Sequence, residues 1–483
     1  MPRSRPLPAP RSPRPFALPS LQLSLALAGA LVLAACSSPS GAPAPSAGQA
    51  PTSGAAPAAP LQPGSSQASG EIDPRAGEAP AAPVVMRSRT TGRPITLEVW
   101  LTDWEQDTQR LFNDHLVPAF EAANPEIAVN IQFLDWRVFT EKLIAAHAGG
   151  VLPDIYQAGA EYVAPLASKG MALEIDPYVE AWGQKDDFYD SAWNTVTYKG
   201  KTYGIPVLSA PQTLMYRKDT LAAAGVTGAP TTWDELLDVA RKTTRREGEK
   251  IQVSGFNARP IWQQYVWFLF QGGGDVFTPE GSVVINSPEA VEALEFFARL
   301  FNGEERVASK SGIAAPTANV GAMAANLVAM QLGNQLTVRD FRANNPQKAG
   351  ELVIAEPTRQ KAQVTTNWTD WLAISRQSKH PDAAWKLVQY VAEKDNLLKY
   401  NETMFFIPPR KSLRTTGYMA DPQFQQFVTV MERFGKPIST TPAALEVYQT
   451  ILKDAVEDAV YGKKSPKQAL DDAAKKIERA LKR

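Results

Sequence analysis

The chain has 483 residues, enough for two or three domains, and its 50 basic and 50 acidic residues leave no net charge. This balance lacks the basic field of nucleic-acid-binding proteins, so we expect no nucleic-acid partner. The single cysteine, Cys36, excludes a disulfide framework and a cysteine-rich metal site. Nucleotide-binding motifs are also missing, and we expect no cofactor and no metal.

Residues 1–35 are predicted to be an export signal. An apolar run at 21–35 has the length of a signal-peptide core and is too short for a membrane span. It ends in Leu-Ala-Ala before Cys36, which resembles the lipobox of bacterial lipoproteins, where the cysteine receives a diacylglyceryl group. We therefore expect lipidation of Cys36 and anchoring at the extracytoplasmic side of the cell membrane, periplasmic or cell-surface. A plain secretory signal with an incidental cysteine is the alternative.

Residues 36–94 are predicted to be a disordered tether. Alanine, proline, serine and glycine dominate the segment, and large apolar residues are almost missing. Such a composition buries too little surface to offset its ordering entropy. As a flexible coil it has a mean span on the order of 40 Å, which would let a folded domain reach a membrane transporter. A spacer with no specific role is equally compatible.

The folded part begins with strands that alternate with helices. Strands are predicted at 95–100, 127–134 and 154–156, and helices at 106–123, 138–148 and 162–169. This alternation predicts a parallel sheet covered by helices, and ligands of such sheets bind beyond the carboxyl ends of the strands.

The loops after these three strands carry aromatic and acidic side chains. Flat aromatic faces stack on the C–H faces of a pyranose, and carboxylates accept hydrogen bonds from its hydroxyls. The loops therefore predict a sugar site, although rim or core tryptophans and solvated acids are the plainer interpretation of each residue alone. The predicted site residues of these loops are Asp103, Trp104, Asp135, Trp136, Ala160 and Glu161.

Residues 201–236 join two halves of the chain. The segment contains G-K-T-Y-G-I-P, then L-M-Y-R-K-D-T-L-A-A-A-G and T-W-D-E-L, with a capping box from Thr232 to Glu235. This spelling resembles the extracellular solute-binding proteins of ABC importers, in the sugar-binding group that includes the maltodextrin-binding proteins. The resemblance extends over about 96–480 and implies an α/β fold of the two-lobe, periplasmic-binding-protein type II kind. Each lobe would be a central sheet flanked by helices, with a hinge of three crossings near 206–212, 362–368 and 408–416.

The second half of the chain is also predicted to alternate between strands and helices. A strand at 251–256 precedes an aromatic helix at 258–270 and a G-G-G-D turn, and in relatives the aromatic at the Trp262 position stacks on the ligand. Trp267, Phe268 and Phe270 are predicted to be core. A helix from Ser287 and a strand at 327–335 follow; relatives often have tryptophan where this chain has Gln335.

Residues 364–375 resemble the return crossing, with a departure from the family. The glycine-rich spelling of relatives is replaced by Asn367, Trp368, Thr369 and Asp370. Trp368 beside Asp370 would fill one end of the cleft and select a small or particular ligand; a packed core tryptophan is the alternative. Helices are predicted at 378–391, 445–461 and 465–481, and residues 405–410 resemble the third crossing. The remaining predicted ligand-binding residues are Gln212, Trp262, Asn334, Trp368 and Asp370.

These patterns predict a monomeric substrate-binding lipoprotein that captures a mono- or oligosaccharide by cleft closure and delivers it to ABC permease subunits. The predicted parts are a signal peptide at 1–35, a tether at 36–94, lobe I at 95–208 plus 366–412, and lobe II at 209–365 plus 413–483. Two alternatives stay open: a receptor for a cationic solute such as a polyamine, and a lipid-anchored glycoside hydrolase with paired carboxylates. A phosphorylated ligand is disfavoured, because the loops offer few cations beyond Arg259. The scattered histidines His115, His147 and His380 are predicted to lie at the surface, and we expect no catalytic residues.

Overall fold

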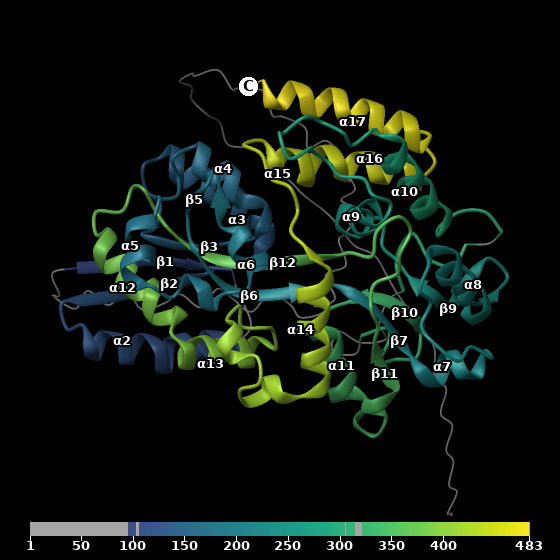
Figure 1. The fold of residues 1–483 in the computed structure, drawn as a ribbon, viewed down its shortest axis with the longest axis horizontal. Coiled ribbons are helices and arrows are strands. Elements are labelled where there is room, and N and C mark those ends of the chain that lie inside the picture. Colours follow the sequence, from purple (N-terminus) through teal and green to yellow (C-terminus); the bar gives the residue numbers. More distant parts are fainter. Residues whose placement is uncertain (1–94, 103–105, 305, 314–320, 483) are drawn as a thin grey trace, which may run out of the picture. The chain divides into compact units, whose positions relative to one another are not determined.

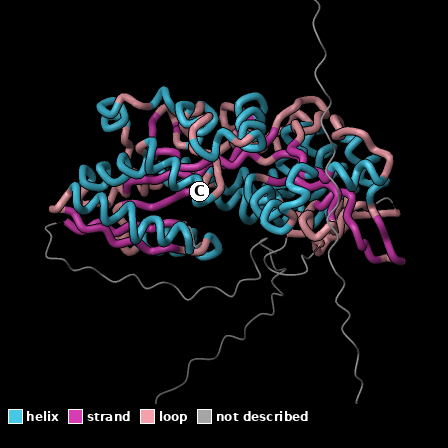
Figure 2. The backbone as a smooth tube through the Cα atoms, turned by 90° about the horizontal axis from the view of Figure 1, so that it is seen from below, coloured by secondary structure: helices cyan, strands magenta, loops and turns pink. Residues whose placement is uncertain are grey.

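The computed structural model describes residues 95–102, 106–304, 306–313 and 321–482. Two central sheets with helices around them organise this part of the chain (Figures 1 and 2). We call the part built on the first sheet lobe I and the part built on the second sheet lobe II. The strands of lobe I are β1 (Ile95–Leu101), β2 (Ile127–Phe133), β3 (Ile155–Ala158), β6 (Ile205–Pro211), β12 (Thr365–Ile374) and β13 (Gly435–Lys436). Those of lobe II are β7 (Thr213–Arg217), β8 (Arg245–Glu247), β9 (Lys250–Asn257), β10 (Val328–Gly333) and β11 (Leu352–Ile354). A small hairpin consists of β4 (Thr197–Tyr198) and β5 (Lys201–Thr202).

Helices flank both sheets, and Figure 1 shows α3 on one side of the lobe I sheet with α2 and α13 on the other. The helices that accompany lobe I are α1 (Gln106–Arg110), α2 (Val117–Ala123), α3 (Trp136–Ala148), α4 (Val163–Ser168), α5 (Asp176–Trp182), α6 (Asp190–Thr195), α12 (Pro381–Ala392) and α13 (Lys394–Met404). Those of lobe II are α7 (Lys218–Ala223), α8 (Trp233–Thr243), α9 (Trp262–Gln271), α10 (Pro288–Arg299), α11 (Gln335–Asn344), α15 (Ala444–Glu446), α16 (Lys453–Val460) and α17 (Pro466–Leu481). Between the two groups lies α14 (Pro422–Phe434), which contacts β6, β12 and β11.

Both sheets are mixed, whereas the sequence predicted parallel pairing. In lobe I, β1 pairs with β2 and β3 in parallel, but β12 runs antiparallel to β3 and β6. In lobe II, β9 and β10 are parallel, and β7 is antiparallel to β10. β8 forms a local antiparallel hairpin with β9, whereas the antiparallel strands β6, β7, β11 and β12 flank the passages of the chain between the lobes. These four strands arrive from the opposite direction without a crossover helix, which a parallel strand would need.

The two-lobe fold class predicted from the sequence is confirmed, and the chain passes between the lobes by separate routes. Gln212 alone joins β6 in lobe I to β7 in lobe II, and residues 355–364 lead back from β11 to β12. A third passage follows Ile407, which forms a bridge with Ser209 on β6, and continues into α14. The predicted lobe boundaries stay a prediction, since α14 touches both sheets. The predicted signal peptide, tether and Cys36 lie outside the described residues.

Three hydrophobic clusters hold this arrangement together. One fills lobe I, a second fills lobe II, and a third gathers side chains from both lobes around α11 and α14, among them Met215, Phe341 and Phe424. The close approach of β6 and β12 depends on Gly204, because a Cβ atom there would lie 2.2 Å from the ring of Trp371. Trp267, Phe268 and Phe270 are buried in the lobe II core, as the sequence predicted. Among the described residues, no helix has the length and apolar character that a bilayer span requires.

Candidate ligand-binding site

The carboxyl ends of β2 and β3 bring an aromatic side chain and an acid together. Trp136 is the first residue of α3, and its ring centroid lies 6.1 Å from that of Tyr162. Gly159, just after β3, lies beneath both groups: a Cβ atom there would be 3.2 Å from Glu161 Oε2 and 3.6 Å from the Trp136 ring. Asp135, which precedes α3, is half-buried. Asp103 and Trp104, predicted at the end of β1, lie outside the described residues.

Glu161 faces lobe II. The side-chain amide of Gln449, in the π-helical turn Val447–Leu452, donates to Glu161 Oε1 over 3.5 Å. Ala160, the neighbouring residue, packs within the lobe II core although it follows a lobe I strand. Burial raises the pKa of Glu161, because a desolvated carboxylate is disfavoured relative to the neutral acid, and the hydrogen bonds it accepts only partly offset this effect.

Asp370 on β12 is held at the ends of β1 and β3. Gln157 Nε2 donates to Asp370 Oδ2 over 2.8 Å, and Gln157 Oε1 accepts from the backbone N–H of Thr102 over 3.2 Å. The pKa of Tyr162 is raised by burial first, and then by the charges of Glu161 and Asp370. Both carboxylates therefore lie close enough to influence the same hydroxyl group, one from the turn after β3 and the other from β12.

The first and second passages between the lobes meet at Gln212. Its backbone N–H donates to Thr366 O over 3.0 Å, and Thr365 Oγ1 donates to its carbonyl. Its side-chain oxygen is buried and has no hydrogen-bond partner among the described residues. The same holds, within the described ranges, for four further groups nearby: Thr366 Oγ1, Asn367 Oδ1, Trp368 Nε1, and both amide atoms of Gln335.

Trp262 lies on the lobe II side of the junction. It is the first residue of α9 and is 5% exposed. Tyr448 packs against it with ring centroids 4.9 Å apart and planes at 34°, and Trp368 meets it at 5.7 Å with planes at 76°. Trp368 is half-buried and contacts the cores of both lobes, and its predicted role in the cleft stays a prediction.

Asn334 has a structural role at the end of β10. Its side-chain oxygen accepts from the backbone N–H of Leu336 over 3.1 Å and so caps the N-terminus of α11. The register of β10 and β7, with Gly333 opposite Thr213, places Asn334 and Gln335 beside Gln212. Asn334 thus lies near the predicted site, but its side-chain oxygen already accepts a hydrogen bond from the first turn of α11.

Sequence reasoning missed the contribution of the C-terminal segment and of Gln157. Tyr448 and Gln449 contact Trp262 and Glu161, yet they lie in a stretch whose amphipathic pattern predicts only a helix. Gln157 is an interior strand residue, and strand sequences do not indicate which polar side chain supports a neighbouring loop. The one usable signal was Gln335, which stands where relatives have an aromatic residue.

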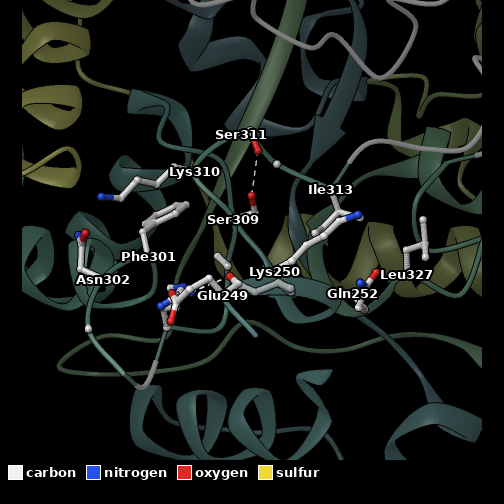
Figure 3. Close-up of a pocket in the computed structure, with 15 residues that line it drawn as sticks. Glu249, Lys250, Gln252, Phe301, Asn302, Ser309, Lys310, Ser311, Ile313 and Leu327 are labelled. Carbon is white, nitrogen blue, oxygen red and sulfur yellow. Dashed lines mark hydrogen bonds and ion pairs between the residues drawn. The ribbon is translucent and has the colours of Figure 1, made fainter. Parts of the chain in front are cut away.

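A cavity of about 730 Å³ lies elsewhere in lobe II, beside β9 and the loop after α10 (Figure 3). Its lining includes Lys250, Phe301 and an ion pair between Arg306 and Glu249. It contains no predicted site residue. We therefore place the candidate site at the lobe junction, where several buried polar atoms have no partner in the described part of the chain, and not in this cavity. Within the described ranges, no group of three or more His, Asp or Glu side chains is placed to hold a metal.

Comparison with known proteins agrees with this architecture. A family profile described as "Bacterial extracellular solute-binding protein" matches residues 102–397, which is more than half of the chain. The chain belongs to the family of bacterial extracellular solute-binding proteins. This solute-binding protein is 23% identical to the maltodextrin-binding protein of Bacillus subtilis over 79% of this chain and 90% of that relative.

Solved structures of similar proteins give the same result for the fold. A solute-binding protein of an ABC transporter from Thermotoga lettingae, bound with alpha-D-tagatose, matches with a TM-score of 0.69 and 25% identity, over 80% of this chain and 99% of that chain. The sugar-binding protein of Xanthomonas citri matches with a TM-score of 0.67 and 23% identity, over 80% of this chain and 97% of that chain, which supports the fold alone. These relatives are binding proteins, not enzymes.

Proposed function

We propose that this chain captures a carbohydrate between its two lobes and delivers it unaltered to the permease of an ABC importer. The observation that carries the proposal is the set of buried polar atoms without described partners at the lobe junction. A buried polar group without a partner costs about 1–3 kcal/mol. A ligand that pairs with several of these atoms recovers that free energy, and it can do so only at the junction where they meet.

The chemistry of these atoms favours a ligand rich in hydroxyl groups. Trp368 Nε1 and Gln335 Nε2 are donors, whereas Gln212 Oε1 and Gln335 Oε1 are acceptors. A hydroxyl group donates and accepts, so a sugar can satisfy both kinds. An ammonium group only donates, and a fully ionised phosphate only accepts. The names of the relatives, a maltodextrin-binding protein and a tagatose-bound solute-binding protein, point the same way.

The aromatic side chains of the junction complete a sugar site. Trp262 and Tyr448 come from lobe II, and Trp136 and Tyr162 come from lobe I. Flat rings stack on the apolar faces of a pyranose while polar groups bind its rim. The carboxylates of Glu161 and Asp370 would accept from sugar hydroxyls. A neutral hydroxyl suits Glu161 as a hydrogen-bond partner, because burial raises the pKa of this carboxyl and so favours its uncharged form.

Capture would proceed by lobe closure without any bond being broken. The contacts of Gln449 with Glu161 and of Trp262 with Trp368 join the lobes across the junction. A solute bound on one lobe gains contacts to the other only in the closed form, so its differential affinity shifts the equilibrium towards closure. A micromolar affinity, about −8 kcal/mol, retains the solute and still permits release. The permease would supply ATP hydrolysis.

We further propose that Cys36 carries the lipid anchor and that the tether holds the lobes near the permease at the extracytoplasmic surface. The support is the spelling before Cys36 and the composition of residues 36–94. The two or three acyl chains of such lipoproteins anchor stably, whereas a single chain holds weakly. Labelling with a fatty-acid analogue tests this proposal, since Cys36→Ser should abolish incorporation if the cysteine is the acceptor.

A cationic solute is the second candidate, favoured by one specific observation. Glu161 and Asp370 both act on Tyr162, so the junction concentrates negative charge. A polyamine would be attracted by these carboxylates and by the faces of Trp136 and Trp262. A glycoside hydrolase would also use two carboxylates, but its relatives would then be enzymes, and those of this chain are binding proteins.

A thermal-shift panel separates these functions. The protein is heated with a set of mono- to trisaccharides, with spermidine and putrescine, and with inorganic phosphate as a control anion. A ligand at one hundred times its Kd stabilises by about 2.7 kcal/mol, which raises the melting temperature by several degrees. We expect at least one sugar to do so, with no sugar product on prolonged incubation. Stabilisation by spermidine alone would select the second candidate, and released product would select the hydrolase.

A further inference from the structure

Trp368 has an unusual position between the two lobes. Its backbone is part of the lobe I sheet, where β12 places it opposite Ala210 of β6. Its ring packs against the core of lobe I and against the core of lobe II. Of the described hydrophobic side chains outside these two cores, it is the one that contacts both. A residue in this position forms a wall where the two lobes meet.

The wall is closed by direct contact with Trp262. The two ring centroids are 5.7 Å apart, within the range of touching aromatic pairs. A sugar ring inserted between two aromatic rings requires a van der Waals gap of about 3.5–4 Å on each side, hence roughly 7–8 Å in total. The Trp262–Trp368 separation is too small for that. Trp262 also packs on Tyr448, with ring centroids 4.9 Å apart. A saccharide ring therefore cannot pass between Trp262 and Trp368 while this contact is made.

The polar groups that would bind the ligand are confined to the same end. Thr366 and Trp368 are two residues apart on β12, so their side chains point to the same face of the sheet at a spacing of roughly 7 Å, whereas Asn367 between them points to the opposite face. Gln212 is hydrogen-bonded to Thr366, and Gln335 lies two residues after Gly333, which pairs with Thr213, the residue after Gln212. This compact set suits one or two sugar rings. A longer chain would leave its additional rings without these partners.

We infer that the ligand is a mono- or disaccharide, and that Trp368 is the specificity-determining residue that excludes longer chains at the β12 end of the site. The inference rests on the proposed function and deepens it by naming the size class of the substrate. The mechanism is exclusion: an additional ring has to separate Trp262 from Trp368 and lose their contact, or hold the lobes apart.

Calorimetric titration with two homologous saccharide series tests the inference. The α-1,4-glucose series and the β-1,4-mannose series are each used from one to four units, so that chain length varies at constant linkage. For the series that binds, we expect the tri- and tetrasaccharide to bind the wild type at least tenfold more weakly than the best shorter ligand. Trp368→Ala should bring the trisaccharide within about threefold of the disaccharide. Trp368→Phe, which keeps an aromatic ring between the lobes, should retain the preference of the wild type.

The outcomes separate this inference from the proposed function. If the wild type binds the tetrasaccharide as tightly as the disaccharide, the size limit is wrong while sugar capture stands. If Trp368→Ala folds, binds the disaccharide and still rejects the trisaccharide, the limit is set by another residue. If Trp368→Ala fails to fold, the wild-type length series and Trp368→Phe decide the size limit. If sugars of both series and of a wider monosaccharide set give no heat, it is the proposed function that fails.

Discussion

Replacing Trp262 gives the sharpest test of where the ligand lies. Trp262→Ala would remove a 5% exposed ring from contact with Tyr448 and Trp368, and such truncations cost about 3–5 kcal/mol. A domain with a total stability of roughly 5–15 kcal/mol tolerates that poorly, so a loss of binding would be ambiguous. Trp262→Phe keeps a ring in place and removes only part of the contact surface.

Trp267→Phe is the matched control. Trp267 lies in the same helix, is fully buried, and donates through Nε1 to Thr365 Oγ1 over 3.0 Å. Both substitutions shrink a buried indole, and we expect each to lower the free energy of unfolding by about 1–2 kcal/mol. Under the proposed function Trp262 stacks on the ligand and Trp267 does not, and an aromatic contact contributes about 0.5–1.5 kcal/mol. The sugar affinity of Trp262→Phe should therefore fall about three- to tenfold, and that of Trp267→Phe should stay within twofold.

Two measurements on each variant complete the test. Urea unfolding followed by circular dichroism gives the stability, and isothermal titration calorimetry with the best sugar gives the affinity. If both variants lose stability equally and also lose affinity equally, the binding effect is a consequence of a weakened lobe. The reasoning that places Trp262 in the site would then be refuted.

Three further predictions concern the fold and its pH dependence. Gly255→Ala should cost about 3 kcal/mol or more in chemical unfolding, because its Cβ atom would lie 1.8 Å from a main-chain carbonyl oxygen of α8, whereas Gly228→Ala, in open space, should be nearly neutral. Asp187→Ala should cost roughly 3–5 kcal/mol in urea at pH 7, since it leaves the fully buried Arg410 without its 3.0 Å ion pair. Burial opposes ionisation of Asp187, but the hydrogen bonds that it accepts lower its pKa overall below the usual 3.8. The stability difference between the wild type and Asp187→Ala should therefore shrink as the pH falls below about 4. A difference that does not change with pH would contradict the ion pair of Asp187 with Arg410. Burial raises the pKa of Glu161 above its usual 4.5, so the stabilisation that the neutral carboxyl gives the folded state is present below pH 4.5 and is lost as the pH rises. The melting temperature of Glu161→Gln should therefore exceed that of the wild type by an amount that grows from pH 4.5 to 8. A difference in melting temperature that stays constant over this range would argue against a buried carboxyl.

Local signals of the sequence predicted the framework well, because they depend on nearby residues. The Thr232 hydroxyl accepts from the backbone N–H of Glu235, and Ser287 caps α10 in the same way, as their sequence positions indicate. One helix boundary shifted in a way that matters. The helix predicted at 138–148 begins at Trp136, so the orientation of that ring is fixed by α3 and not by a loop. The helix predicted at 106–123 contains a π-helical turn at Leu111–Leu116, which periodicity alone does not indicate.

The site itself could be predicted only in part, since it is made by contacts between distant segments. Gln449 and Glu161 are 288 residues apart, and nothing in either local pattern indicates that they meet. The acids and aromatics after β2 and β3 were found because strand ends gather at one edge of a sheet. Which amide lacks a partner depends on the register of β7, β10 and β12. The role of Asn334 could not be predicted from its position alone, because its side chain caps α11.

A crystal structure with the tightest-binding sugar tests the central claim most directly. We predict the sugar at the junction of the lobes, with hydroxyl groups within about 3.2 Å of Gln212 Oε1 and Trp368 Nε1 and one ring face on Trp262. A sugar bound in the lobe II cavity beside Lys250 and Phe301, with the junction side chains still unpaired, would contradict the account.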